Sequence, residues 1–179
     1  MKQNGEKIDH CLVGEPTSPS QMGEMMKIGR RGSMNAKITA TGIQGHSAYP
    51  DRSNNPIVAM VKLLDKLVSH QLDAGTEHFD PSTLAITSVD TGNKASNVIP
   101  AVTKATINIR FNDSHSGSSL VSWLKDEIEK VSAEYGIKFK TDFKISGESF
   151  ITPPGELSDL ISKAVKQELG VTPKLSTTG

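Results

Sequence analysis

The sequence has a single cysteine, no excess of either charge and no long apolar stretch. Cys11 alone cannot form an internal disulfide or a cysteine-rich zinc site, so a reducing, cytoplasmic setting is expected. With 20 Lys and Arg against 20 Asp and Glu, no basic excess exists to neutralise phosphates. The longest apolar run, residues 57–61, is far short of the ~20 residues of a spanning helix. We therefore expect neither nucleic acid nor a membrane as a partner.

The remaining composition is that of a globular protein. The chain has 179 residues, of which 35% are hydrophobic, which is enough to bury a core. The first ten residues are polar and lack the apolar stretch of a signal peptide. Residues 173–176 resemble a strand, and the chain ends directly after it on small residues. From these two ends we expect a piece of a longer protein.

Alternating apolar and polar residues predict four strands, each with one covered face. These segments are 33–41, 83–89, 102–111 and 137–145. Helical spacing of apolar residues predicts two intervening helices, at 56–72 and 116–135.

The resulting order, β-α-β-β-α-β, predicts an α+β fold of the ferredoxin-like class. We expect one four-stranded antiparallel sheet with two helices on a single face, within a domain at 31–148. The flanks, 1–30 and 149–179, do not fit this unit and belong to another structure. The second flank contains a third predicted helix at 156–169.

Glu15 follows an apolar segment, residues 9–13, that is interpreted as a strand. A carboxylate at a strand end is a common metal or acid–base position, because the backbone holds it facing a crevice. The alternative is a solvated loop glutamate, which is the commoner situation. One carboxylate does not make a zinc site, which needs about three or four ligands.

Arg30 and Arg31 lie beside Ser33 at the entrance to the first predicted strand. The planar guanidinium group matches the two oxygens of a carboxylate, although an exposed basic turn is equally compatible with the pattern. Arg110 projects from the polar face of the third predicted strand and is also free to bind an anion.

The loop around His46 is the densest signal in the sequence. Gly42 and Gly45 permit tight turns and display the histidine between a strand and a helix, where it could donate a hydrogen bond to an oxyanion. A surface histidine without a special role is the alternative. Asn97 lies in a predicted turn, where it either caps local backbone groups, the commoner role, or binds a ligand.

Several motifs together resemble the M20 family of dinuclear zinc amidohydrolases. They are VGEPTSP, GRRGS, GIQGHSAYPDRSNNPI, SNVIPA and INIRF. Within that family, the GRRGS and GHSAYP motifs favour members that hydrolyse a succinyl amide. The resemblance implies that 1–30 and 149–179 are partial segments of an α/β catalytic domain, and that 31–148 is the lid and dimerisation domain.

The resemblance also implies roles for individual residues. Glu15 resembles a ligand of one of two zinc ions, cobalt being another possible metal. His46 resembles the histidine that the lid supplies to the partner subunit's active site, where it stabilises a tetrahedral oxyanion. The residues that resemble contacts to the small-molecule substrate are Arg30, Arg31, Ser33, Tyr49, Asn97 and Arg110.

Other family motifs are absent from this sequence: the His-x-Asp motif, the bridging Asp, the Glu-Glu pair with the general base, and the C-terminal His ligand. In the whole enzyme, zinc-bound water would attack the succinyl amide. With one of five metal ligands, the present chain is expected to bind no metal tightly and to hydrolyse nothing.

The resemblance further implies a homodimer, formed through the edge strand 83–89 and the helix 56–72, because exposed sheet edges pair with other chains. Two alternatives remain open. One is another M20 deacylase that acts on other N-acyl amino acids such as acetylornithine. The other is a free-standing ferredoxin-like binding module.

Overall fold

In a computed structural model, which describes residues 7 and 9–178, the chain divides into two compact units. The larger unit covers Arg31–Phe150, and the smaller combines Met1–Arg30 with Ile151–Gly179. The chain passes between them at two short strands, β2 (Gly29–Arg30) and β9 (Phe150–Ile151).

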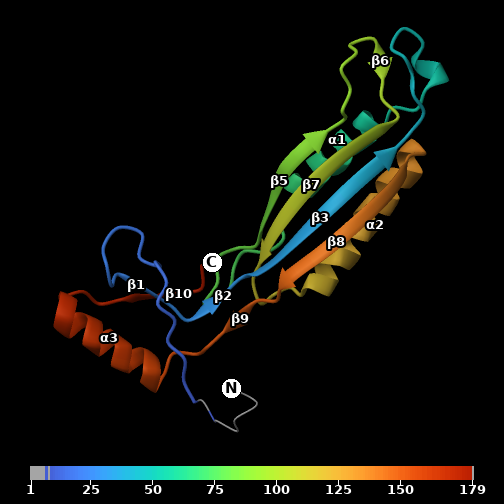
Figure 1. Cartoon of the computed structure of the whole chain (residues 1–179). Helices are drawn as coiled ribbons and strands as arrows, with labels where there is room; N and C mark the ends of the chain where they lie inside the picture. Colours follow the sequence, from blue (N-terminus) through green and yellow to red (C-terminus); the bar gives the residue numbers. More distant parts are fainter. Residues whose placement is uncertain (1–6, 8, 179) are drawn as a thin grey trace. The chain divides into compact units, whose positions relative to one another are not determined.

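The larger unit is built on a four-stranded antiparallel sheet (Figure 1). Its strands are β3 (Gly32–Thr41), β5 (Thr83–Asp90), β7 (Val102–Phe111) and β8 (Lys138–Gly147). In the order β5-β7-β3-β8, strands β5 and β8 form the edges. Two helices, α1 (Pro56–Ser69) and α2 (Gly117–Tyr135), complete the element order. The predicted ferredoxin-like α+β fold is confirmed.

The alternation of residues in the central strands explains why only one face of the sheet is covered. Met34, Ala36, Ile38 and Ala40 of β3 are all fully buried, whereas Lys37 between them is exposed. Both helices pack on the apolar face. They complete one core with Ala59, Met60, Leu63, Leu64, Leu67, Leu120, Leu124, Ile128 and Val131.

Helix α1 begins where the sequence predicts but ends three residues earlier. Asn55 accepts a hydrogen bond from the Ile57 amide (3.0 Å), and Pro56 opens the helix. At the other end, His70 already has an extended backbone. Leu72 still packs against the core, so the helical spacing of apolar residues continues past the helix itself.

A β-bulge in the edge strand β5 was not predicted. The pairing with β7 shifts between Ile86 and Ser88, which leaves Thr87 without a partner in the register. As a result Val89 pairs with Ala105 and faces the helix-covered side, like Ile86, although the two are three residues apart. The edge therefore presents Ile86 and Val89 on the same side, both partly exposed.

In the smaller unit, β1 (Met25–Lys27) and β10 (Lys174–Ser176) form a parallel pair, and α3 covers Glu156–Leu169. The predicted strand at 9–13 is wrong, because these residues have no regular structure. Leu12 and Val13 are exposed, and no strand of the described chain pairs with them, so their backbone groups have no sheet to join. Among the described residues, no helix is long and apolar enough to cross a membrane.

Candidate functional site

The residues predicted to form a site lie in three places. Within the larger unit, His46, Tyr49 and Asn97 lie in the loops at one end of the sheet, and Arg31, Ser33 and Arg110 lie at the opposite end. Glu15 and Arg30 belong to the smaller unit.

The first group, which we call the tip, depends on two short strands. β4 (Gly45–His46) pairs with β6 (Val98–Ile99), with His46 opposite Val98. The Ser47 amide then donates to the Asn97 carbonyl (2.9 Å). This pairing brings His46 and Asn97 together across 51 residues of sequence.

Two glycines allow the tip to fold back on itself. A Cβ on Gly42 would lie 2.0 Å from the Asn54 carbonyl oxygen, and one on Gly45 would lie 2.6 Å from the Ser53 Cβ. Ile43 and Asn54 exchange two backbone hydrogen bonds, of 2.9 and 3.0 Å, at this crossing. The loop that carries His46 is thus fastened to the residues that lead into α1.

The hydrogen bonds of His46 define which of its ring nitrogens is free to donate. The Ala48 amide donates to Nδ1 (3.1 Å), so the neutral ring carries its proton on Nε2. Nε2 lies 3.5 Å from the Asn97 Nδ2, and two donors do not bond each other. Two groups that can each donate a hydrogen bond thus lie next to each other at the tip, which is the kind of arrangement that binds an oxyanion.

The expected capping role of Asn97 is not seen in the described residues. Its side chain contacts His46, while the nearby Asn93 bonds the local backbone, donating to the Val98 carbonyl (2.8 Å) and accepting from the Ala95 amide (3.1 Å). The turn motif alone did not distinguish the two asparagines.

The tip also contains Arg52, which was not among the predicted site residues. The Tyr49 ring lies 5.9 Å from the His46 ring, centroid to centroid, and the guanidinium carbon of Arg52 lies 5.2 Å from the Tyr49 centroid. A 3₁₀ turn, η2 (Pro50–Arg52), produces this stacking. The three-residue spacing of Tyr and Arg around a Pro is the signal that could have found it.

At the opposite end of the sheet, Ser33 pairs with Arg110 in the β3–β7 register. Ser33 is buried, whereas Arg110 is half-buried on the polar face, as predicted. The Arg31 Nη1 donates to the Pro81 carbonyl (3.2 Å), and its Nε is buried without a partner among the described residues. Strands β3 and β7 thus hold Ser33 and Arg110 together, with Arg31 held separately by the α1–β5 connection.

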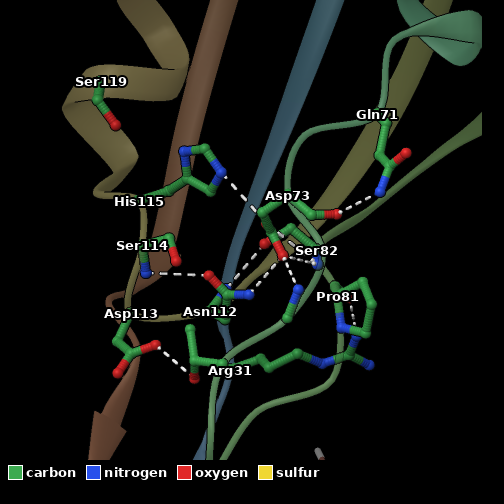
Figure 2. Close-up of polar contacts among 12 residues, drawn as sticks. Arg31, Gln71, Asp73, Pro81, Ser82, Asn112, Asp113, Ser114, His115 and Ser119 are labelled. Atoms are coloured by element: carbon green, nitrogen blue, oxygen red, sulfur yellow. Dashed lines mark hydrogen bonds and ion pairs between the residues drawn. The ribbon is translucent and has the colours of Figure 1, made fainter.

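A buried polar cluster lies behind Arg31 and fastens that connection (Figure 2). Asp73 accepts hydrogen bonds from the amides of Gly75 (2.8 Å) and Ser82 (3.1 Å) and from the Asn112 Nδ2 (2.7 Å). The His115 Nε2 lies 3.2 Å from the Asp73 Oδ2. Asn112 is fully buried, and its backbone N–H donates a hydrogen bond to the Ser82 hydroxyl (3.0 Å).

The charge of Asp73 is stabilised by these contacts. Burial raises the pKa of its carboxyl, but the hydrogen bonds from Ser82, Gly75 and Asn112 outweigh it and hold the pKa below its ordinary value of 3.8. The cluster does not form a nucleophilic triad with Ser119 of α2, because that hydroxyl is committed to the capping box and donates to the Ser116 carbonyl (2.9 Å). We assign the cluster a structural role.

The smaller unit does not supply a metal centre by itself. Glu15 is exposed within a segment without regular structure, so its expected place at a strand end is wrong. In the described part of the chain, no group of three or more His, Cys, Asp or Glu side chains could hold a metal ion. The residues present therefore do not fit the dinuclear centre that the resemblance implies.

Comparison with known sequences gives a consistent result. Residues 28–136 match the peptidase dimerisation domain family. All 179 residues align with succinyl-diaminopimelate desuccinylases, at 62% identity for that of Cereibacter sphaeroides and 61% for that of Ruegeria pomeroyi. The chain spans 47% of the length of each of these relatives.

Solved structures support the fold. A tripeptidase from Staphylococcus aureus superposes with a TM-score of 0.70 at 18% identity, over 85% of this chain and 39% of its own. A hydantoinase/carbamoylase-family amidase from Burkholderia multivorans gives a TM-score of 0.66 at 17% identity, over 86% and 37%.

Proposed function

Because this chain belongs to the M20 peptidase dimerisation domain family, we propose that it is the lid and dimerisation part of a cytoplasmic amidohydrolase. The proposed enzyme hydrolyses N-succinyl-LL-2,6-diaminopimelate to succinate and LL-diaminopimelate, for lysine and cell-wall biosynthesis. The observation that carries this proposal is the identity of 61–62% with desuccinylases across the whole chain. Two zinc ions, or cobalt, belong to the proposal for the whole enzyme only.

The flanks support a place beside a catalytic domain. Parallel strand pairs such as β1–β10 are normally buried within larger α/β sheets. No residue of α3 is buried, although the helix is amphipathic, and its apolar residue Leu160 is largely exposed. An amphipathic helix normally covers its apolar side with other structure. We therefore assign 1–30 and 149–179 to segments of the catalytic domain, and expect the 179-residue chain alone to be inactive.

The length of the sheet supports the proposal that His46 serves the partner subunit. The Ser33–Arg110 pair lies near the start of the ten-residue strand β3 and the tip lies beyond its other end, so the two are at least about 26 Å apart at a rise of ~3.3 Å per residue. One small substrate cannot touch both groups of a single chain. In a two-fold dimer, each active site can combine the Arg110 of one chain with the His46 of the other.

The geometry at the tip supports a role in stabilising negative charge. The His46 Nε2 and the Asn97 Nδ2 offer two adjacent donors to the oxygen of the amide under attack. The loop that carries His46 is fastened through Asn54, and its Ser47 amide bonds the Asn97 carbonyl, so little reorganisation is needed when substrate binds.

We predict that His46→Ala in the full-length protein lowers kcat by about 10²–10³-fold, the usual cost of removing one oxyanion donor. KM and the dimer should change little, because His46 is exposed and packs on nothing in the core. Steady-state kinetics on N-succinyl-diaminopimelate measure this effect, with His10→Ala as the control. An unchanged kcat in His46→Ala would remove the role from this residue, and better turnover of acetylornithine by the wild type would favour the alternative deacylase.

A mixing experiment tests whether His46 acts across the dimer. His46→Ala and Arg110→Ala should each be nearly inactive as homodimers. After subunit exchange, half of the dimers contain one chain of each kind, and each of these has one intact site. Activity should then return to roughly a quarter of the wild-type level. No recovery, with exchange verified by mass, would show that both residues act in the same chain's site.

The two edges of the sheet differ in a way that favours β5 and α1 for dimerisation. β8 exposes Lys138, Lys140 and Lys144, and lysines on an edge discourage pairing. β5 carries the partly exposed Ile86 and Val89. Beside it, α1 exposes an apolar stripe of Val58, Val61 and Val68.

We predict that Val61→Glu weakens the dimer by about 100-fold in Kd or more, because a charge would be buried without a partner. Val61 is 54% exposed within the chain, so the fold itself should tolerate the change. Light scattering over a range of concentrations, with and without zinc, measures the effect, and Lys140→Glu on the opposite edge is the control. Dissociation by Lys140→Glu with a stable Val61→Glu dimer would move the interface to β8.

A further inference from the structure

The tip carries a cationic side chain beside His46 that the proposed function does not use. Arg52 stacks on the Tyr49 ring at 5.2 Å, within the ~6 Å typical of a cation–π contact. Tyr49 in turn lies against His46. The three side chains therefore form one row on the surface, and both Tyr49 and Arg52 are exposed.

The backbone holds Arg52 in this place. The Arg52 amide donates to the Tyr49 carbonyl (3.1 Å), and the Ser53 amide and hydroxyl both donate to the Pro50 carbonyl (3.0 and 2.8 Å). In a 3₁₀ turn, side chains three residues apart eclipse each other. Tyr49 and Arg52 are so spaced, which places the guanidinium group over the ring.

Arg52 forms no ion pair or side-chain hydrogen bond among the described residues, although Asp51 is its neighbour in sequence. The contact with the Tyr49 ring is made without a hydrogen bond and so uses none of the guanidinium N–H donors. Those donors match the two oxygens of a carboxylate. An arginine that lies over a tyrosine ring and has no ion-pair partner in the described part of the chain, next to a proposed oxyanion donor, is suited to hold a charged end of the substrate.

We propose that Arg52 is a specificity residue that binds a carboxylate of the substrate in the partner subunit's active site. This inference rests on the proposed function, in which His46 acts on the scissile amide. With the scissile amide at His46, the carboxylates of the substrate would lie near the row formed by His46, Tyr49 and Arg52. Arg52 contributes to substrate binding and takes no part in bond breaking.

The test uses the full-length enzyme with Arg52→Gln and Arg52→Lys, and Asp51→Asn as the control for general charge effects. Arg52→Gln should raise KM for N-succinyl-diaminopimelate roughly tenfold with kcat within about twofold, because a charge-assisted contact is lost from binding alone. Arg52→Lys should recover part of the affinity, and Asp51→Asn should leave KM nearly unchanged. A fall in kcat at constant KM would instead indicate a disturbed loop and would overturn the proposal.

Two substrate analogues identify the carboxylate. N-butyryl-diaminopimelate lacks the acyl carboxylate, and N-succinyl-lysine lacks the distal one. Wild type should discriminate against both, and Arg52→Gln should lose its discrimination against one of them. Retention of both preferences together with a raised KM would assign Arg52 to the third carboxylate, beside the scissile amide, whereas retention with an unchanged KM would overturn the proposal. If the wild type did not hydrolyse N-succinyl-diaminopimelate itself, the proposed function would fail, which is a different result from an unaffected Arg52→Gln variant.

Discussion

Replacing Asp73 by alanine should lower the free energy of unfolding by about 1–3 kcal/mol, the usual cost of leaving buried donors without their acceptor. The substitution leaves three N–H donors, from Gly75, Ser82 and Asn112, without their acceptor. It also leaves the His115 ring without its carboxylate. The connection from α1 to β5 should loosen as a result. Chemical denaturation of the 179-residue chain at neutral pH measures the loss.

The matched control is Glu129→Gln, an exposed position on α2 that should change stability by no more than about 0.5 kcal/mol. The pH dependence provides a second readout. The pKa of Asp73 is below 3.8 in the folded chain, so its contribution is complete above the unfolded value and is lost as pH falls through the folded one. The free energy of unfolding of Asp73→Asn should therefore fall less steeply than that of the wild type as the pH decreases below about 4. Identical acid profiles would show that other carboxylates govern acid unfolding.

Gly42→Ala should destabilise the larger unit by about 3 kcal/mol, at the upper end of the cost of overpacking. The added methyl group would lie 2.0 Å from the Asn54 carbonyl oxygen and 2.9 Å from the Pro56 Cδ. The two backbone hydrogen bonds between Ile43 and Asn54 would have to lengthen or break. In the full-length enzyme, we expect a loss of kcat similar to that of His46→Ala, because the same crossing positions the tip.

Gly147→Ala is the control, since a Cβ there would meet nothing within 4 Å. Thermal unfolding of the chain and steady-state kinetics of the enzyme provide independent measurements. If Gly42→Ala were as stable as Gly147→Ala, the crossing would be more compliant than its contacts indicate. If Gly42→Ala lost stability but kept full activity, the crossing of Ile43 and Asn54 would not be what positions the tip.

The sheet was predictable because its residues follow a strict period. In β3 and β7, every second side chain enters the core, so spacing alone indicates the faces and the partners. The bulge at Thr87 breaks the period in an exposed edge strand, where little burial constrains the register. At residues 9–13 a strand was predicted where the structure has none. Their apolar content indicated a strand, but a strand also requires a partner strand to pair with.

The candidate site was less accessible to sequence reasoning. His46 and Asn97 are 51 residues apart, and only the pairing of β4 with β6 brings them together. Their predicted roles came from the family resemblance, while the turn motif favoured backbone capping for Asn97. Arg52 was missed because its contact with Tyr49 depends on a single 3₁₀ turn, for which the short spacing of Tyr, Pro and Arg is the one signal in the sequence. The Asp73 cluster joins two loops, and neither loop has a sequence pattern that predicts this contact.

The ten-residue length of β3 has an evolutionary consequence. Adding two residues to the strand and its neighbours would carry the tip about 6.6 Å further out while preserving which side chains face the helices. Adding one residue would invert every side chain beyond it, unless a compensating bulge arose. Without such a bulge, descendants of this protein can therefore change the reach of the tip only in steps of two residues. In a two-fold assembly each such step occurs twice, so both active sites would adjust to longer or shorter substrates together.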